Sequence, residues 1–136
     1  MILTINDSVW INDLKDHFTK CYPELKIEFY KTKRKGKIDL KNSDLISVNI
    51  PVGTIRKKGI SGDYKIYSHY TVSKVENELR DIYGLNVQIF RNENNGWIRT
   101  TETDRFTLAE QMKMSKQAAQ SIIPIAKEQL AEYDEL

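Results

Sequence analysis

The chain has 136 residues with a formal net charge of +2, and 40% of its residues are hydrophobic, a composition that suits a soluble globular domain. No apolar run approaches the roughly 20 residues of a membrane-spanning helix, and the start of the chain lacks the basic and apolar regions of a secretory signal. Cys21 is the single cysteine, which excludes an internal disulfide and makes the cytoplasm the expected location.

The first residues predict a strand–helix–strand unit. A short strand is expected over residues 2–5, and apolar residues at helical spacing predict a helix from Trp10 to Tyr22. Pro23 ends this helix, because proline lacks the backbone N–H that a continuing helix needs. Alternating apolar and polar residues over 24–31 then predict a strand with one polar face.

The same unit is predicted a second time. Strands are expected over 63–67 and 85–91, with a helix over 71–83 between them. Ser73-x-x-Glu76 is a candidate capping box, and the acidic side of the helix, Glu76 included, is expected to face solvent. Gly84 suits the left-handed position just past a helix end.

Two such units predict an α+β fold, specifically a ferredoxin-like sandwich with a mainly antiparallel sheet. Residues 38–60 form an insertion between the units. A short helix is expected near 51–58, although the alternation of Ile46, Val48 and Ile50 permits a strand instead.

An added hairpin strand and a helix follow the second unit. Asn95-Gly96 is the predicted hairpin turn, with a return strand over 97–101. Thr107-x-x-Glu110 is expected to open a C-terminal helix. We therefore expect one α+β domain over 1–111 and a C-terminal helical extension over 112–136.

Three side chains at helical spacing form a candidate catalytic set. Asp13, His17 and Cys21 could supply a carboxylate, a base and a thiol nucleophile on one helix face. Cys21 is expected within the apolar face and at the helix C-terminus, where neither burial nor the helix dipole favours a thiolate. Cys21, His17 and His69 are also too few for a zinc site of the common types. We therefore expect no enzyme activity, no metal and no cofactor.

Positive charge is concentrated in the middle of the chain. Residues 31–60 hold nine Lys and Arg against two Asp, whereas the segments on both sides are neutral or mildly acidic. RNA-binding domains with an open sheet face stack bases on aromatic side chains there and hold phosphates with basic loops. The candidate residues for such an interface are Tyr30, Lys31, Lys33, Arg34, Lys35, Lys37, Arg56, Lys57, Lys58, Tyr67 and Phe90, and Trp97 could join them.

The C-terminal helix offers two alternatives to this interpretation. It could cover the sheet face, so that Leu108, Met112 and Ile122 bury Tyr30 and Phe90. The absence of both RNA-binding signature sequences also counts against an RNA-binding face. It could instead pair with another chain. Its apolar anchors within 107–133 would be Met112, Met114, Ile122, Ile123, Ile125 and Leu130. The leading expectation is a non-enzymatic binding or adaptor domain that acts through a protein partner or self-association, with nucleic-acid binding as the alternative.

Four short stretches carry a resemblance to other proteins. They are LKIEFYK (25–31), PVGTIRKK (51–58), LNVQIFR (85–91) and WIRTTETDRFTLAEQ (97–111). With them the chain resembles an uncharacterised family of small bacterial proteins of similar length, over about residues 1–111. The resemblance implies a cytosolic, single-domain protein, and it brings no established activity, cofactor or site residue.

Overall fold

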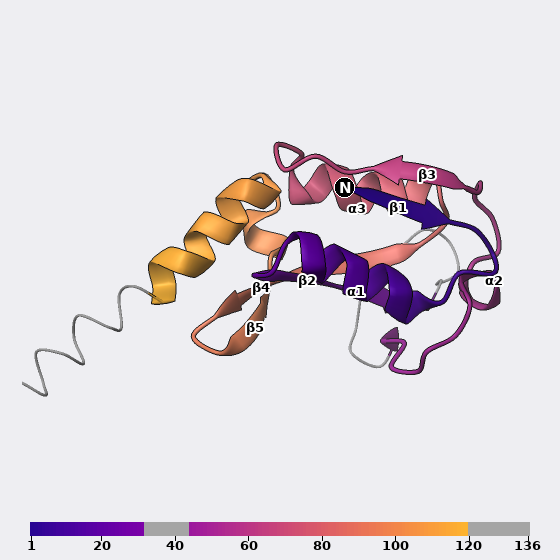
Figure 1. The fold of residues 1–136 in the computed structure, drawn as a ribbon, viewed down its shortest axis with the longest axis horizontal. Helices are drawn as coiled ribbons and strands as arrows, with labels where there is room; N and C mark the ends of the chain where they lie inside the picture. Colours follow the sequence, from indigo (N-terminus) through magenta and orange to yellow (C-terminus); the bar gives the residue numbers. More distant parts are fainter. Residues whose placement is uncertain (32–43, 120–136) are drawn as a thin grey trace, which may run out of the picture.

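The computed structural model describes residues 1–31 and 44–119, and Figure 1 shows how the helices and strands follow one another along the chain. The strands are β1 (Ile2–Ile5), β2 (Leu25–Tyr30), β3 (Gly62–Lys65), β4 (Asn86–Glu93) and β5 (Gly96–Arg99). The helices are α1 (Ile11–Cys21), α2 (Val52–Ile55), α3 (Val72–Asp81) and the short 3₁₀ helix η3 (Thr101–Thr103), followed by a helix over 108–119.

The predicted α+β class and both strand–helix–strand units are confirmed, since β1-α1-β2 and β3-α3-β4 follow each other along the chain. All strand pairs are antiparallel, as expected. The strands nevertheless form two sheets and not one. One sheet pairs β1 with β3, and the other has the order β2-β4-β5. Each unit therefore contributes one strand to each sheet.

The separation into two sheets has a visible cause at the edges of β2 and β4. Beyond β2, the backbone at Leu45 pairs with Tyr30. On the edge of β4 that faces away from β2, the second half of β4 pairs with β5. On the same strand, the backbone N–H of Ile89 donates to the carboxylate of Glu76 at 2.8 Å. These contacts occupy the edges that β1 or β3 would need in order to extend the same sheet.

One hydrophobic core lies between the two sheets and the helices. From β2 the side chains of Leu25, Ile27 and Phe29 enter it, and from β4 those of Val87 and Ile89. The helices and the small sheet complete the core with Leu3, Ile5, Ile11, Leu14, Phe18, Tyr64, Ile66, Val72, Val75 and Leu79. The β2-β4-β5 sheet therefore has a core face and an outer face, and the outer face carries the polar positions of β2.

Side-chain caps fix the starts of α3 and of the helix over 108–119. The hydroxyl of Thr71 accepts the N–H of Lys74 at 3.0 Å, so the cap is Thr71 and not the predicted Ser73. At the second helix the predicted capping box is confirmed. The hydroxyl of Thr107 accepts the N–H of Glu110, and the Glu110 carboxylate accepts the N–H of Thr107, both at 3.1 Å.

The β4–β5 hairpin turns one residue earlier than predicted. Asn94 and Asn95 have φ of 56° and 64°, the two left-handed residues of a tight two-residue turn, and β5 begins at Gly96. This turn sets the register of β5, which places Trp97 opposite Asn92.

The helix over 108–119 is attached to the end of β4. Leu108 is fully buried in the core, the carboxamide of Gln111 accepts from the Arg91 guanidinium, and the Ser115 hydroxyl donates to the Asn92 carbonyl. The domain boundary predicted at residue 111 falls inside this helix. The rest of the predicted extension, 120–136, lies outside the described residues.

Candidate functional site

Three strands place a ring between two cations on the outer face of the β2-β4-β5 sheet. The register sets Lys26 of β2 opposite Phe90 of β4, and Phe90 opposite Arg99 of β5. All three side chains point away from the core, because Leu25 and Ile27 on either side of Lys26 point into it.

The cations lie close to aromatic rings on this face. The ammonium of Lys26 is 5.1 Å from the ring centroid of Phe90 and 5.1 Å from that of Trp97. The guanidinium carbon of Arg99 lies 5.6 Å from the Phe90 centroid and 5.8 Å from that of Tyr30. These are cation–π distances, so the rings and the positive charges form one surface. We call Lys26, Phe90, Trp97 and Arg99 the hairpin face.

The hairpin face is accessible, whereas the other end of the sheet's outer face is covered. Trp97 is 40% exposed, Arg99 is exposed and Phe90 is half-buried. Tyr30, which we predicted to stack a base, is only 2% exposed, and its neighbour Gln88 is also buried. Tyr30 therefore lies at the covered end of this face and does not offer its ring to a base.

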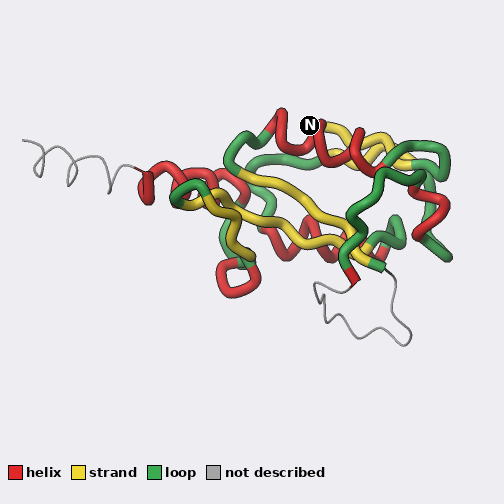
Figure 2. The backbone as a smooth tube through the Cα atoms, turned by 90° about the horizontal axis from the view of Figure 1, so that it is seen from below, coloured by secondary structure: helices red, strands yellow, loops and turns green. Residues whose placement is uncertain are grey.

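The C-terminal helix does not cover the hairpin face as far as residue 119. It is held by Arg91, which lies opposite Leu25 and so belongs to the other face of the sheet. In both Figure 1 and Figure 2 this helix lies at one end of the molecule and leads away from it toward the grey trace. The predicted burial of Phe90 beneath Leu108 and Met112 is thus not what the structure has, because both residues pack on the core side.

Within the described residues, the Glu28 carboxylate pairs with a cation of the hairpin face. Glu28 shares the outer face of β2, and its oxygens are 2.9 Å from the ammonium of Lys15 and 3.4 Å from that of Lys26. These two lysines and one carboxylate together carry a net positive charge.

The predicted basic residues fall into three groups. Lys33, Arg34, Lys35 and Lys37 lie outside the described residues, and Lys31 is exposed at the end of β2. Lys57 and Lys58 are exposed, and with Arg80 they line a cavity of about 200 Å³ beside Gly84 and Asn86. Asn86 lies opposite Tyr30, so this cationic cavity lies near the covered end of the sheet and not beside the hairpin face.

Arg56 has a different role from the one predicted. Its guanidinium donates to the Asp7 carboxylate at 2.8 Å, to the carbonyls of Ile60 and Tyr83 at 2.6 and 3.1 Å, and to the Ser61 hydroxyl at 2.8 Å. The side chain is only 4% exposed. These bonds hold the end of the insertion against the end of α3, and they occupy the donors that a phosphate would need.

Tyr67 lies outside the candidate interface. It follows β3, in the small sheet, where its ring packs 5.3 Å from Tyr70 and 5.5 Å from His69. Tyr67 is 47% exposed. The three rings form a separate aromatic cluster, so the prediction that Tyr67 joins Phe90 on one sheet face does not hold.

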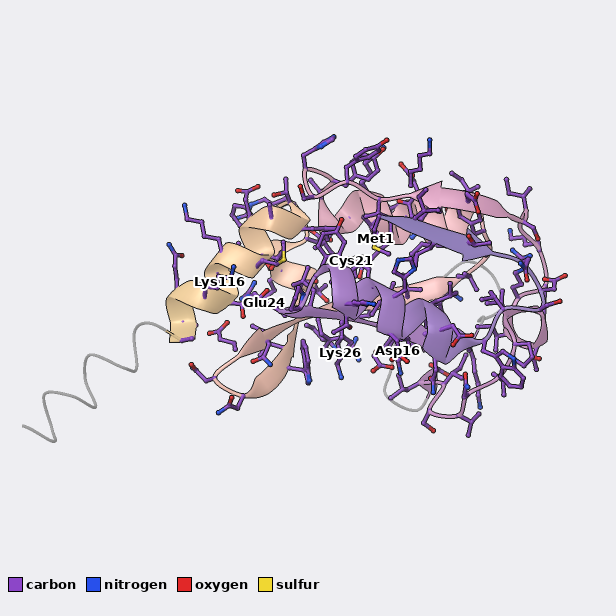
Figure 3. All side chains as sticks on the ribbon, in the orientation of Figure 1. Met1, Asp16, Cys21, Glu24, Lys26 and Lys116 are labelled. Carbon is purple, nitrogen blue, oxygen red and sulfur yellow. The ribbon has the colours of Figure 1, made fainter. Side chains whose placement is uncertain are left out.

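The candidate catalytic residues are arranged along the exposed side of α1. Asp13, His17 and Cys21 are all exposed, and Figure 3 shows Cys21 at the end of that helix. The expected burial of Cys21 is wrong, because Tyr22 takes the buried position at the helix end. No hydrogen bond joins these three described side chains, and the described part of the chain holds no group of three His, Cys, Asp or Glu placed to bind a metal ion.

Sequence reasoning missed Lys26 and Arg99. The alternation of β2 already placed Lys26 on the same side as Tyr30, so it could have been found. Arg99 depends on the hairpin register, which a turn at Asn94-Asn95 fixes and a turn at Asn95-Gly96 would have shifted.

No family model, curated protein or solved structure matches this chain, so the resemblance to a bacterial family stays a prediction. Within the described residues, no helix has the length and apolar character to cross a membrane.

Proposed function

We propose that the protein binds single-stranded nucleic acid through the hairpin face. The observation that carries the proposal is the row Lys26–Phe90–Arg99 from three adjacent strands, with the exposed Trp97 ring beside it. Stacking platforms of this kind combine aromatic rings for bases with cations for phosphates.

The proposed roles follow from the chemistry of each side chain. Trp97 and the accessible part of Phe90 stack successive bases, which contributes about 1–3 kcal/mol per base. Lys26 and Arg99 turn from the rings to the phosphates as the bases take their place. Lys57 and Lys58, which line the cationic cavity beside Asn86, give a longer strand a second contact for its phosphates.

A single strand fits this surface better than a duplex does. Bases in a duplex already stack on one another, so their faces are closed to Trp97 and Phe90. Recognition by stacking is tolerant of sequence, because every base has a flat face. We therefore expect weak preference among the four bases.

Binding to a protein partner stays a prediction with less support. Four of the apolar anchors that the predicted C-terminal helix would use lie outside the described residues, namely Ile122, Ile123, Ile125 and Leu130. Of the others, Met112 packs against the core of its own domain.

Replacing Trp97 or Lys26 by alanine is expected to weaken the binding of a fluorescein-labelled twelve-nucleotide oligo(dT) or oligo(U). Loss of one stacked base lowers affinity by about tenfold or more. Loss of Lys26 also flattens the salt dependence, by about 0.7 in the log–log slope for each phosphate contact removed. Fluorescence anisotropy at several salt concentrations measures both quantities. Trp97 is exposed enough that its loss should leave the fold intact.

Matched controls come from elsewhere on the molecule. Trp10 is 46% exposed at the start of α1, and Lys116 is exposed on the helix over 108–119, well separated from Lys26 in Figure 3. Trp10→Ala and Lys116→Ala should bind like the wild type. In a Trp10→Phe background the remaining Trp97 fluorescence should be quenched on binding. Equal loss in the control and test variants, or binding without quenching, would contradict the proposal.

A further inference from the structure

A second, larger cavity lies between the segment 45–50 and helix α2. Its volume is about 430 Å³, within the range of about 300–1,000 Å³ that small-molecule sites have. The residues that line it are Lys31, Leu45, Ile46, Ser47, Val48, Ile50, Thr54, Ile55 and Lys57. None of the four hairpin-face residues is among them, and Lys57 is the one residue that this cavity shares with the cationic cavity beside Gly84 and Asn86.

The lining combines an aliphatic wall with positive charge. Five of the lining residues are Leu, Ile or Val, two carry hydroxyls and two are lysines. Lys31 comes from the end of β2 and Lys57 from the segment after α2, so the two lysines line the cavity from different elements. The described lining residues include no carboxylate.

Backbone hydrogen bonds hold the wall in place without a ligand. On the β2 side, the N–H of Ile46 donates to the carbonyl of Phe29 and the N–H of Lys31 to that of Asp44, both at 2.9 Å. On the other side, the carbonyl of Ile50 accepts the N–H of Ile11 at 3.0 Å. The segment that forms the wall is thus anchored at both ends, as in cavities that are formed before their ligand arrives.

We propose that this cavity binds an amphipathic monocarboxylate, an anion with a saturated hydrocarbon chain. Its chain lies against Leu45, Ile46 and Val48, and its carboxylate pairs with Lys31 and Lys57. Charge complementarity selects this occupant, because a cation would meet two ammonium groups with no carboxylate among the described lining residues. A small inorganic anion would leave the aliphatic wall in water, so it lacks the apolar part of the binding energy.

Octanoate is the probe, titrated into the full-length ¹⁵N-labelled chain and followed by NMR. We expect shifts at the amides of Ile46, Val48 and Ile55. Each methylene buried contributes about fourfold in affinity, so octanoate should bind at least about tenfold more tightly than butanoate. Octyltrimethylammonium, with the same chain and the opposite charge, should bind more weakly than octanoate. Equal binding of octanoate and butanoate, or of octanoate and the cation, would overturn the proposal.

Two substitutions test the location of the site without destabilising the hydrophobic core. Val48 is 61% exposed, so Val48→Asp should fold and should abolish octanoate binding by placing a carboxylate on the wall. Lys57→Glu should weaken it about tenfold, while Lys65→Glu, on the exposed side of β3, should have no effect. Trp97→Ala should bind octanoate like the wild type, which separates this proposal from nucleic-acid binding. Unchanged octanoate binding in both Val48→Asp and Lys57→Glu would show that the cavity is not the site.

Discussion

Gly84→Ala is expected to lower the free energy of unfolding by about 3 kcal/mol or more, a large part of the 5–15 kcal/mol typical of a domain. Gly84 has a φ of 72°, which costs a residue with a Cβ about 1–2 kcal/mol. A Cβ there would also lie 1.8 Å from the carbonyl oxygen of Lys58, so the backbone itself would have to move. Urea unfolding of the two proteins measures the difference.

Two further variants separate the two causes. Asparagine tolerates the left-handed conformation, so Gly84→Asn would be mild if only φ mattered and severe if the contact with Lys58 matters. We expect it to be severe. Gly62→Ala is the matched control, because a Cβ at Gly62 meets nothing within 4 Å. If Gly84→Ala cost no more than Gly62→Ala, the close crossing of the two segments would be refuted.

This crossing illustrates what the sequence could predict and what it could not. The left-handed conformation of Gly84 follows from its position after a helix, and the sequence predicted it. The close contact could not be predicted, because the partner segment at Lys58 and Gly59 belongs to the insertion. Nothing in the pattern of the insertion says where it packs.

The same limit applies to the sheets. Alternation correctly placed Leu25 and Ile27 in the core and Phe90 on the outer face, because the side-chain period of a strand is a local property. Which strands pair is set by long-range contacts. The Glu76 carboxylate accepts the Ile89 N–H at the edge of β4, where another strand would otherwise pair. The sequence pattern wrongly indicated that this carboxylate faces solvent.

For the candidate site too, the sequence predicted some features and missed others. Counting charges drew attention to residues 31–58, but composition cannot tell a lysine in solvent from a buried guanidinium. Arg56 is the clearest example, since its donors are taken by Asp7, Ser61 and two carbonyls. Lys26 and Arg99 were not predicted, because both lie outside the basic segment of the sequence. Only the strand register brings them to either side of the Phe90 ring.

Stability is expected to fall as the pH rises from about 4.5 to about 7, because of Glu76. Burial raises the pKa of its carboxyl from 4.5 to about 7; the hydrogen bond from the Ile89 N–H opposes the rise, Asp104 adds to it, and Arg80 opposes it. In this window the unfolded chain has released the proton that the folded chain retains, so unfolding becomes easier with rising pH. The loss reaches up to about 3 kcal/mol above pH 7 and is absent below pH 4.5.

Glu76→Gln should remove this pH dependence and should be more stable than the wild type at pH 8 by about 1–3 kcal/mol. The glutamine keeps an oxygen that can accept the Ile89 N–H but carries no charge to bury. Glu76→Ala also removes the pH dependence, but it leaves that N–H without its acceptor, which costs about 1–3 kcal/mol at every pH. Urea unfolding of all three proteins at pH 4.5, 6 and 8 gives the slopes. A glutamine variant with the slope of the wild type would mean that Glu76 is ionised in the folded protein throughout this range, and that its bond to β4 is that of a carboxylate.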